Sequence, residues 1–180
     1  MTSKPSKPPS TWPEPAWAAS LAEFLRRHPG ELAAGPVQPT PAGWFDADRA
    51  AELAAVHRRM LSAAYQSDER RHGRPDYWVV DAVGDCEDKA LWCHHRLAAL
   101  GWPKASMRLW LCLARQGGRW RGHAVLAVSL TLSDGAVVDV ALDCRHGTPM
   151  RRGDLGYRLW RIVDPVVADA SLETGAAGQD

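Results

Sequence analysis

The sequence predicts an α+β domain in which helices precede an antiparallel sheet. Apolar residues recur at helical spacing as far as about residue 100, and beyond that point they alternate with a period of two. Short glycine-containing turns separate the alternating segments. Helices followed by strands, with one helix packed on the sheet, define this class of fold.

Two helices are predicted before residue 75. The segment WAASLAEFLRRH, from Trp17, is a short amphipathic helix that Pro29-Gly30 ends. A Pro/Gly-rich linker follows through Gly43. Residues 46–71 carry apolar side chains at helical spacing behind an Asp cap, and they predict one long helix with a solvated charged face.

A third helix and then a meander of strands are predicted in the second half. The helix DCEDKALWCHHRLAALGW follows Gly84, with Asp85 suited to its N-cap and Gly101 to its end. The strands MRLWLCLAR, GHAVLAVSLTL and AVVDVALDC are joined by QGG and SDG turns, and YRLWRIVD is predicted as the last strand. We expect one domain over residues 16–166, a disordered segment over 1–15 and a loose tail over 167–180.

The composition narrows the function classes. A formal net charge of +1 does not indicate nucleic acid or an anionic membrane as an obligatory partner. No stretch reaches the roughly 20 apolar residues that a membrane span needs. The four cysteines contain no CxxC pair, and a chain of 180 residues can fold without a disulfide framework. At least one thiol should therefore be free.

Cys86 is the candidate nucleophile. It lies at the start of the third helix, where unpaired backbone N–H groups favour a thiolate and can bind an oxyanion. Gly84 would let a substrate backbone approach closely. A lone cysteine is more often a small buried residue, but Asp85, Glu87 and Asp88 are an unsuitable setting for a buried apolar thiol.

His123 is the candidate base because it opens a long strand, where its imidazole can face a helix N-terminus. The other histidines are expected on the surface or pointing away from Cys86: His28, His57, His72, His94, His95 and His146. The base would take the Cys86 proton, and the thiolate would attack an amide carbonyl to give a thioester. Water or an amine would then resolve the thioester.

Asp143 is preferred to Asp139 as the residue that orients His123. A three-residue loop at 133–135 would place Asp143 opposite Val125 and diagonal to His123, roughly 7–8 Å away between Cα atoms. Asp139 would lie about six residues along the strand, on the order of 20 Å away. A two-residue turn would instead place both aspartates on the opposite face of the sheet.

Four blocks of sequence carry a family resemblance. In order, GDCEDKA, GHAVLAV, ALDC and GYRLW resemble the bacterial transglutaminase-like cysteine proteinases, a group that includes proteases of large biofilm adhesins. The resemblance covers residues 76–163, about half of the chain. It implies a papain-like, transglutaminase-like core and a catalytic triad of Cys86, His123 and Asp143.

The resemblance also implies calcium, with Asp85 and Glu87 as ligands and Asp88 as a further candidate. Carboxylates are the hard oxygen ligands that Ca²⁺ prefers. The alternative is that these acids only cap the helix and complement its dipole. The sequence departs from the family pattern at Cys144, where Asn is common, and at Lys89, where an aromatic residue is common.

By resemblance, the substrate would be a large surface adhesin, a membrane-bound regulator would be a partner, and the compartment would be the periplasm. The first residues show no apolar signal segment, which favours the cytoplasm for the chain as written. Other readings stay open: a transglutaminase or deamidase with the same triad, and a non-catalytic binding protein. A last alternative is a zinc site built from thiols and imidazoles, namely Cys86, Cys93, His94, Cys112, His123 and Cys144.

Overall fold

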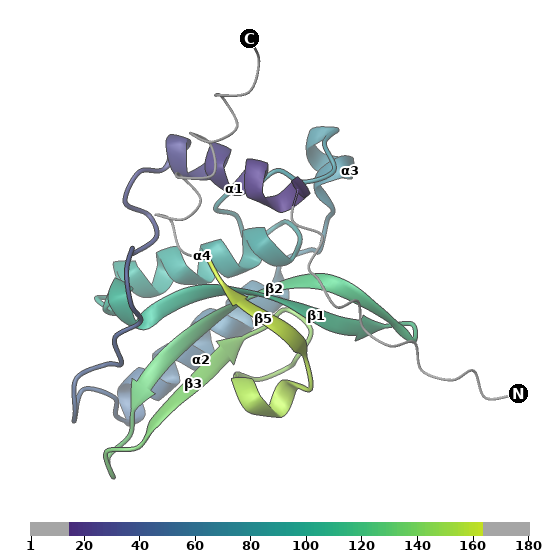
Figure 1. Ribbon diagram of the computed structural model, residues 1–180. Helices are drawn as coiled ribbons and strands as arrows, with labels where there is room; N and C mark the ends of the chain where they lie inside the picture. Colours follow the sequence, from purple (N-terminus) through teal and green to yellow (C-terminus); the bar gives the residue numbers. More distant parts are fainter. Residues whose placement is uncertain (1–14, 164–180) are drawn as a thin grey trace, which may run out of the picture.

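The computed structural model describes residues 15–163, and in it helices cover one face of a five-stranded antiparallel sheet (Figure 1). The helices are α1 (Pro15–Arg27), α2 (Ala47–Ser62), α3 (Asp68–His72) and α4 (Cys86–Ala99), with short 3-10 turns η1 (Lys104–Ser106) and η2 (Arg152–Leu155). The segments expected to be disordered or loose lie outside the described residues, apart from Pro15. The α+β class is confirmed. Within residues 15–163, no helix is long and apolar enough to cross a membrane.

The sheet has the order β4-β3-β2-β1-β5 and every pairing is antiparallel. Its strands are β1 (Met107–Gln116), β2 (Arg119–Thr131), β3 (Val137–Leu142), β4 (Met150–Arg151) and β5 (Arg158–Ile162). The last predicted strand therefore exists, and it pairs with β1 at one edge of the sheet. This pairing places the last strand of the domain next to β1.

The core lies between the sheet and the helices α1, α2 and α4. It is built from side chains at helical spacing and from alternate strand residues, among them Phe24, Leu53, Met60, Leu91, Leu97, Leu109, Leu126 and Val128. A smaller cluster of Val125, Ala141 and Leu155 covers the other face of the sheet. The nucleophile helix α4 is thus packed on the sheet, as predicted.

The prediction of one helix over residues 46–71 is wrong. The chain leaves helical geometry at Ala63, and α3 begins only at residue 68. The buried Lys89 ammonium of α4 donates hydrogen bonds to the carbonyls of Met60 (3.1 Å), Ala63 (2.9 Å) and Ala82 (2.7 Å). Carbonyls at a helix end lack intrahelical partners, so this ammonium fixes the end of α2. The lysine that departs from the family pattern therefore has a structural role.

The predicted register of the β2–β3 hairpin is confirmed. The Leu132 N–H donates to the Ala136 carbonyl at 2.8 Å, and Gly135 has the left-handed φ of 82° that a three-residue loop requires. Ser129 pairs with Asp139, which places that aspartate far along the strand from the start of β2. The same register brings the end of β3 back to the beginning of β2.

Candidate active site

His123 and Asp143 are in hydrogen-bond contact. The imidazole Nε2–H donates to Asp143 Oδ1 at 2.8 Å, and both side chains are buried. The Arg145 backbone N–H donates to the same oxygen at 2.9 Å. Burial raises the pKa of Asp143, but the hydrogen bonds that its carboxylate accepts outweigh it and hold the pKa below its usual value. Asp143 is therefore an ionised acceptor that leaves the imidazole Nδ1 available as a base.

The rejected candidate, Asp139, lies elsewhere. Its Oδ2 is 3.1 Å from Arg152 Nε, in an ion pair on the strand β3. The hairpin register is the physical reason, since it separates the two aspartates by four residues along the strand. Asp143 is the one whose carboxylate contacts His123.

Tyr157, immediately before β5, adds a second side-chain donor to Asp143. Its hydroxyl donates to Asp143 Oδ2 at 2.5 Å, and its ring meets the His123 ring edge-on, with centroids 5.6 Å apart. His146 Nε2 lies 3.1 Å from the same hydroxyl. Tyr157 belongs to the GYRLW block, but no local pattern assigns it a role, because strand order alone brings β5 beside this site. His146, which was passed over as the base because it follows the last strand of the meander, lies at the edge of the site.

His57 was predicted on the surface, and this is wrong. The side chain is completely buried, and its Nε2–H donates to the Asp143 backbone carbonyl at 2.9 Å. Burial lowers the pKa of His57, so the neutral ring is favoured. The signal was its helical spacing with Leu53 and Met60, four residues before it and three after it, which places it on the core face of α2.

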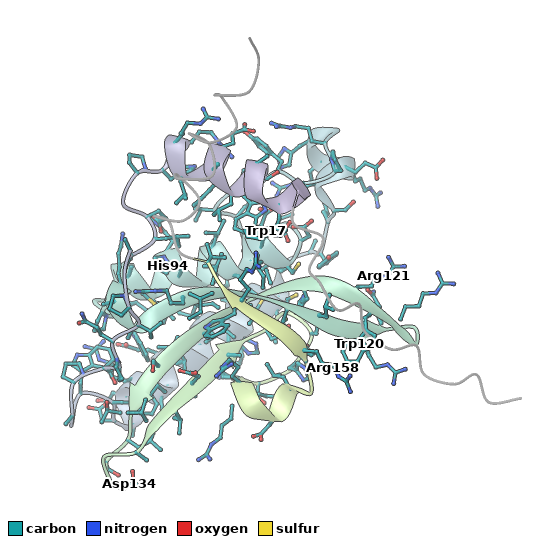
Figure 2. All side chains as sticks on the ribbon, in the orientation of Figure 1. Trp17, His94, Trp120, Arg121, Asp134 and Arg158 are labelled. Atoms are coloured by element: carbon teal, nitrogen blue, oxygen red, sulfur yellow. The ribbon has the colours of Figure 1, made fainter. Side chains whose placement is uncertain are left out.

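Cys86 is the first residue of α4, as predicted, and it is half-buried. Together with His123 it lines a pocket of about 280 Å³ whose walls are otherwise mostly apolar, with Trp17, Trp78 and Leu111 among them. Figure 2 shows Trp17 between α1 and the sheet. The thiol donates to Glu87 Oε2 at 2.9 Å rather than to the imidazole. Burial raises the pKa of Cys86 well above its usual value, and the Glu87 carboxylate raises it further.

Gly84 has a structural role, because a β-carbon at this position would overlap the Asp88 side chain. That carboxylate accepts a hydrogen bond from the Val79 N–H at 2.8 Å and lies 3.6 Å from Arg71. Asp88, a further candidate calcium ligand from sequence, is therefore turned toward the loop before α4 and away from the carboxylates described next.

Three carboxylates converge beside the nucleophile. Oxygen atoms of Asp68, Asp85 and Glu87 all lie within 4.8 Å of one another. Asp85 occupies the N-cap position of α4, but its side chain does not cap the helix. Burial raises the pKa values of all three, and the repulsion between their charges raises those of Asp85 and Glu87 further. The sequence missed Asp68 because the predicted long helix concealed the Ser67 start of α3.

This cluster fits a hard divalent cation. Two of its buried oxygens, Asp68 Oδ1 and Asp85 Oδ1, have no hydrogen-bond partner among the described residues. The same is true of Asp76 Oδ2, whose residue lines the adjacent pocket. Unpaired buried carboxylates are costly unless a metal ion or another cation compensates them. Oxygen donors with several negative charges suit Ca²⁺. The alternative that Asp85 only caps the helix is disfavoured, because its side chain accepts no hydrogen bond from the first amides of α4.

The six-residue zinc site is not assembled. Among the described residues, the group that includes a thiol is His123, Asp143 and Cys144, and it does not contain the other three cysteines. Cys93 and Cys112 are fully buried, while His94 faces Glu31 at 3.3 Å. A thiol at a helix start and a histidine paired with a buried aspartate instead line one pocket, which is the arrangement of groups that a cysteine hydrolase needs.

The comparisons identify the family within this class. The chain belongs to the bacterial transglutaminase-like cysteine proteinases (BTLCP), whose family model matches residues 16–148. EGTA-treated LapG from Legionella pneumophila has 19% identity and a TM-score of 0.50, over 69% of this chain and 77% of that one. Calcium-bound LapG has 22% identity and a TM-score of 0.49, and the alignment spans 63% of this chain and 62% of that chain's length. Comparison with curated sequences gives no match.

Replacing Tyr157 with Phe tests the second donor to Asp143. A hydrogen bond to a buried carboxylate contributes about 1.5–3 kcal/mol, so kcat should fall roughly 10- to 100-fold while KM changes little. Loss of this donor should also raise the pKa of Asp143, which moves the acidic limb of the kcat profile to higher pH. The matched control is Tyr77→Phe, which also removes only a hydroxyl; an equal loss of kcat in both variants would refute a specific role.

Proposed function

We propose that the protein is a cysteine peptidase that hydrolyses an amide bond of a protein substrate through a thioester. The observation that carries the proposal is that His123, paired with the buried Asp143, lines the same pocket as Cys86 at the start of α4. Cys86 is the nucleophile, His123 the general base and acid, and Asp143 the residue that orients the ring. Family membership supports the reaction class.

The chemistry follows from these positions. His123 takes the Cys86 proton, and Sγ attacks the carbonyl carbon, so a C–S bond forms and an oxyanion develops. The first amides of α4 have no intrahelical acceptors and can stabilise that charge. His123 then gives its proton to the departing amine as the C–N bond breaks. Water, deprotonated by the same ring, attacks the thioester and releases the acid and the Cys86 thiol.

Asp68, Asp85 and Glu87 would hold the cation, and Asp76 lies close enough to the pocket to assist. A bound Ca²⁺ would supply positive charge that offsets the carboxylates beside the thiol. The solved structures of LapG include a calcium-bound and an EGTA-treated form, and this supports calcium for the present chain. By family resemblance we extend the proposal to a large surface adhesin as substrate and a membrane-bound regulator as partner.

Selective alkylation tests the activated thiol. In calcium-free buffer the carboxylates oppose the thiolate, so iodoacetamide should label Cys86 slowly. With calcium, the Cys86 rate should rise about tenfold or more, because each unit of lowered pKa gives roughly ten times more thiolate. Cys144, also half-buried, is the internal control and should respond little. Peptide mapping by mass spectrometry measures both rates, and equal responses would contradict the proposal.

Product analysis separates hydrolysis from acyl transfer. A labelled Gln-containing peptide incubated with excess amine should show cleavage and no amine adduct if water resolves the thioester. An adduct mass would instead assign the chain to transamidation with the same triad. The measurement is intact mass, with Cys86→Ala protein as the background control.

A further inference from the structure

The β1–β2 hairpin carries a local excess of positive charge. Residues 107–131 contain no Asp or Glu, and three exposed arginines lie near the turn: Arg115, Arg119 and Arg121. The turn of this hairpin extends beyond the helices that cover the sheet (Figure 1). Two further exposed arginines belong to the same end of the molecule: Arg145 donates to the Arg115 carbonyl at 2.5 Å, and Arg158 pairs with Leu113 in β1.

None of these exposed arginines is neutralised within the described residues. We call Arg115, Arg119, Arg121, Arg145 and Arg158 the arginine cluster; all five are exposed, and no ion pair of residues 15–163 includes any of them. Trp120 holds part of the cluster in place. The guanidinium carbons of Arg158 and Arg115 lie 4.9 Å and 5.7 Å from its ring. Figure 2 shows Trp120 and Arg158 together below the hairpin, with Arg121 directed outward.

Two members of the cluster continue one wall of the candidate active site. Gly122, His123 and Ala124 line the pocket, and Arg121 precedes them directly on β2. Side chains alternate along a strand, so Arg119 and Arg121 share the face of β2 that carries His123, at roughly 13 Å and 7 Å along the strand from it. The arginines that pack on Trp120 lie on the other face. A polypeptide that leaves the pocket along β2 on the His123 face therefore meets two unpaired guanidinium groups.

We propose that Arg119 and Arg121 of the arginine cluster bind an acidic segment of the protein substrate, whose Asp or Glu residues lie about two to four residues from the amide bond that is cleaved. Guanidinium groups bind carboxylates in bidentate geometry, and complementary charge raises the association rate and fixes orientation. A protein segment is favoured over other polyanions because the cluster adjoins the pocket that holds Cys86. This inference rests on the proposed peptidase function, because the acidic residues are placed relative to the amide bond that is cleaved.

The test uses the full chain with Cys86→Ala, so that bound peptide is not cleaved. The probe is a fluorescein-labelled ten-residue peptide of alternating Asp and Ser, and fluorescence anisotropy measures its Kd at low salt. The variant Arg119→Glu, Arg121→Glu should raise Kd at least about tenfold, since two attractive contacts become repulsive. The matched control is Arg58→Glu, Arg59→Glu on α2, two exposed arginines, and it should leave Kd within about twofold.

Three outcomes would overturn the proposal. The first is equal binding of a peptide with Asn in place of Asp, and the second is equal loss of affinity in both double variants. The third is binding of phosphatidylglycerol vesicles or single-stranded DNA, lost in Arg119→Glu, Arg121→Glu, without binding of the acidic peptide. Hydrolysis by the wild-type chain is measured separately. Hydrolysis without acidic-peptide binding refutes the proposed role of the arginines, whereas acidic-peptide binding without hydrolysis refutes the proposed catalytic triad.

Discussion

Replacing Cys86 with Ala is expected to lower kcat/KM by at least about 10⁴-fold, because the reaction then has no nucleophile and only the pocket and the helix amides remain. The substitution removes one half-buried sulfur and its hydrogen bond to Glu87, so the melting temperature should change little. Steady-state hydrolysis of a protein substrate and thermal unfolding by circular dichroism measure the two effects.

The control and the double variant sharpen this result. Cys144→Ser changes the other half-buried thiol. It should keep kcat/KM within about threefold, because Cys144 takes part in no step of the proposed reaction. Asp143→Asn should reduce activity by about 10⁴-fold alone, yet add almost nothing to Cys86→Ala, because members of a triad act as a unit. Residual activity of Cys86→Ala above about one per cent would refute Cys86 as nucleophile.

The parts of the site that sequence could predict depend on local geometry. The loop at 133–135 fixes the register of β2 and β3, and this register alone selects Asp143 over Asp139. The N-terminal position of Cys86 likewise follows from the capping pattern after Gly84. Both are short-range features, for which turn and cap residues carry direct signals.

The parts that sequence missed depend on contacts between distant segments. Tyr157 reaches Asp143 only because β5 pairs with β1, and nothing in the local pattern at 157–162 specifies that edge. The break after α2 depends on Lys89, 26 residues after Ala63. That break releases Asp68 into the carboxylate cluster, so one wrong helix concealed a candidate metal ligand. His57 differs, since its helical spacing with core residues was visible and was outweighed by charged neighbours in the sequence.

Removing divalent cations should make the fold less stable as the pH rises. Burial and repulsion raise the pKa values of Asp68, Asp85 and Glu87, and burial raises that of Asp88 to about 8. The folded protein then binds more protons than the unfolded chain, so the free energy of unfolding falls with increasing pH, by up to about 1.4 kcal/mol per pH unit for each titrating group. The window to measure is pH 6.5–8.5, because His94, whose pKa burial lowers to about 4, acts in the opposite direction below it.

Calcium should reverse this loss of stability. At 100 times Kd, a ligand of the folded state adds about 2.7 kcal/mol, or roughly 5–10 °C in melting temperature for a chain of this size. Asp68→Asn removes one repelling charge and one ligand, so it should raise the melting temperature in EGTA and diminish the calcium increment. Glu69→Gln, the exposed neighbour on α3, is the matched control and should do neither.

EGTA should also suppress hydrolysis, because the cluster contacts the Cys86 thiol through Glu87. A wild-type melting temperature that millimolar calcium leaves unchanged would refute the cation site.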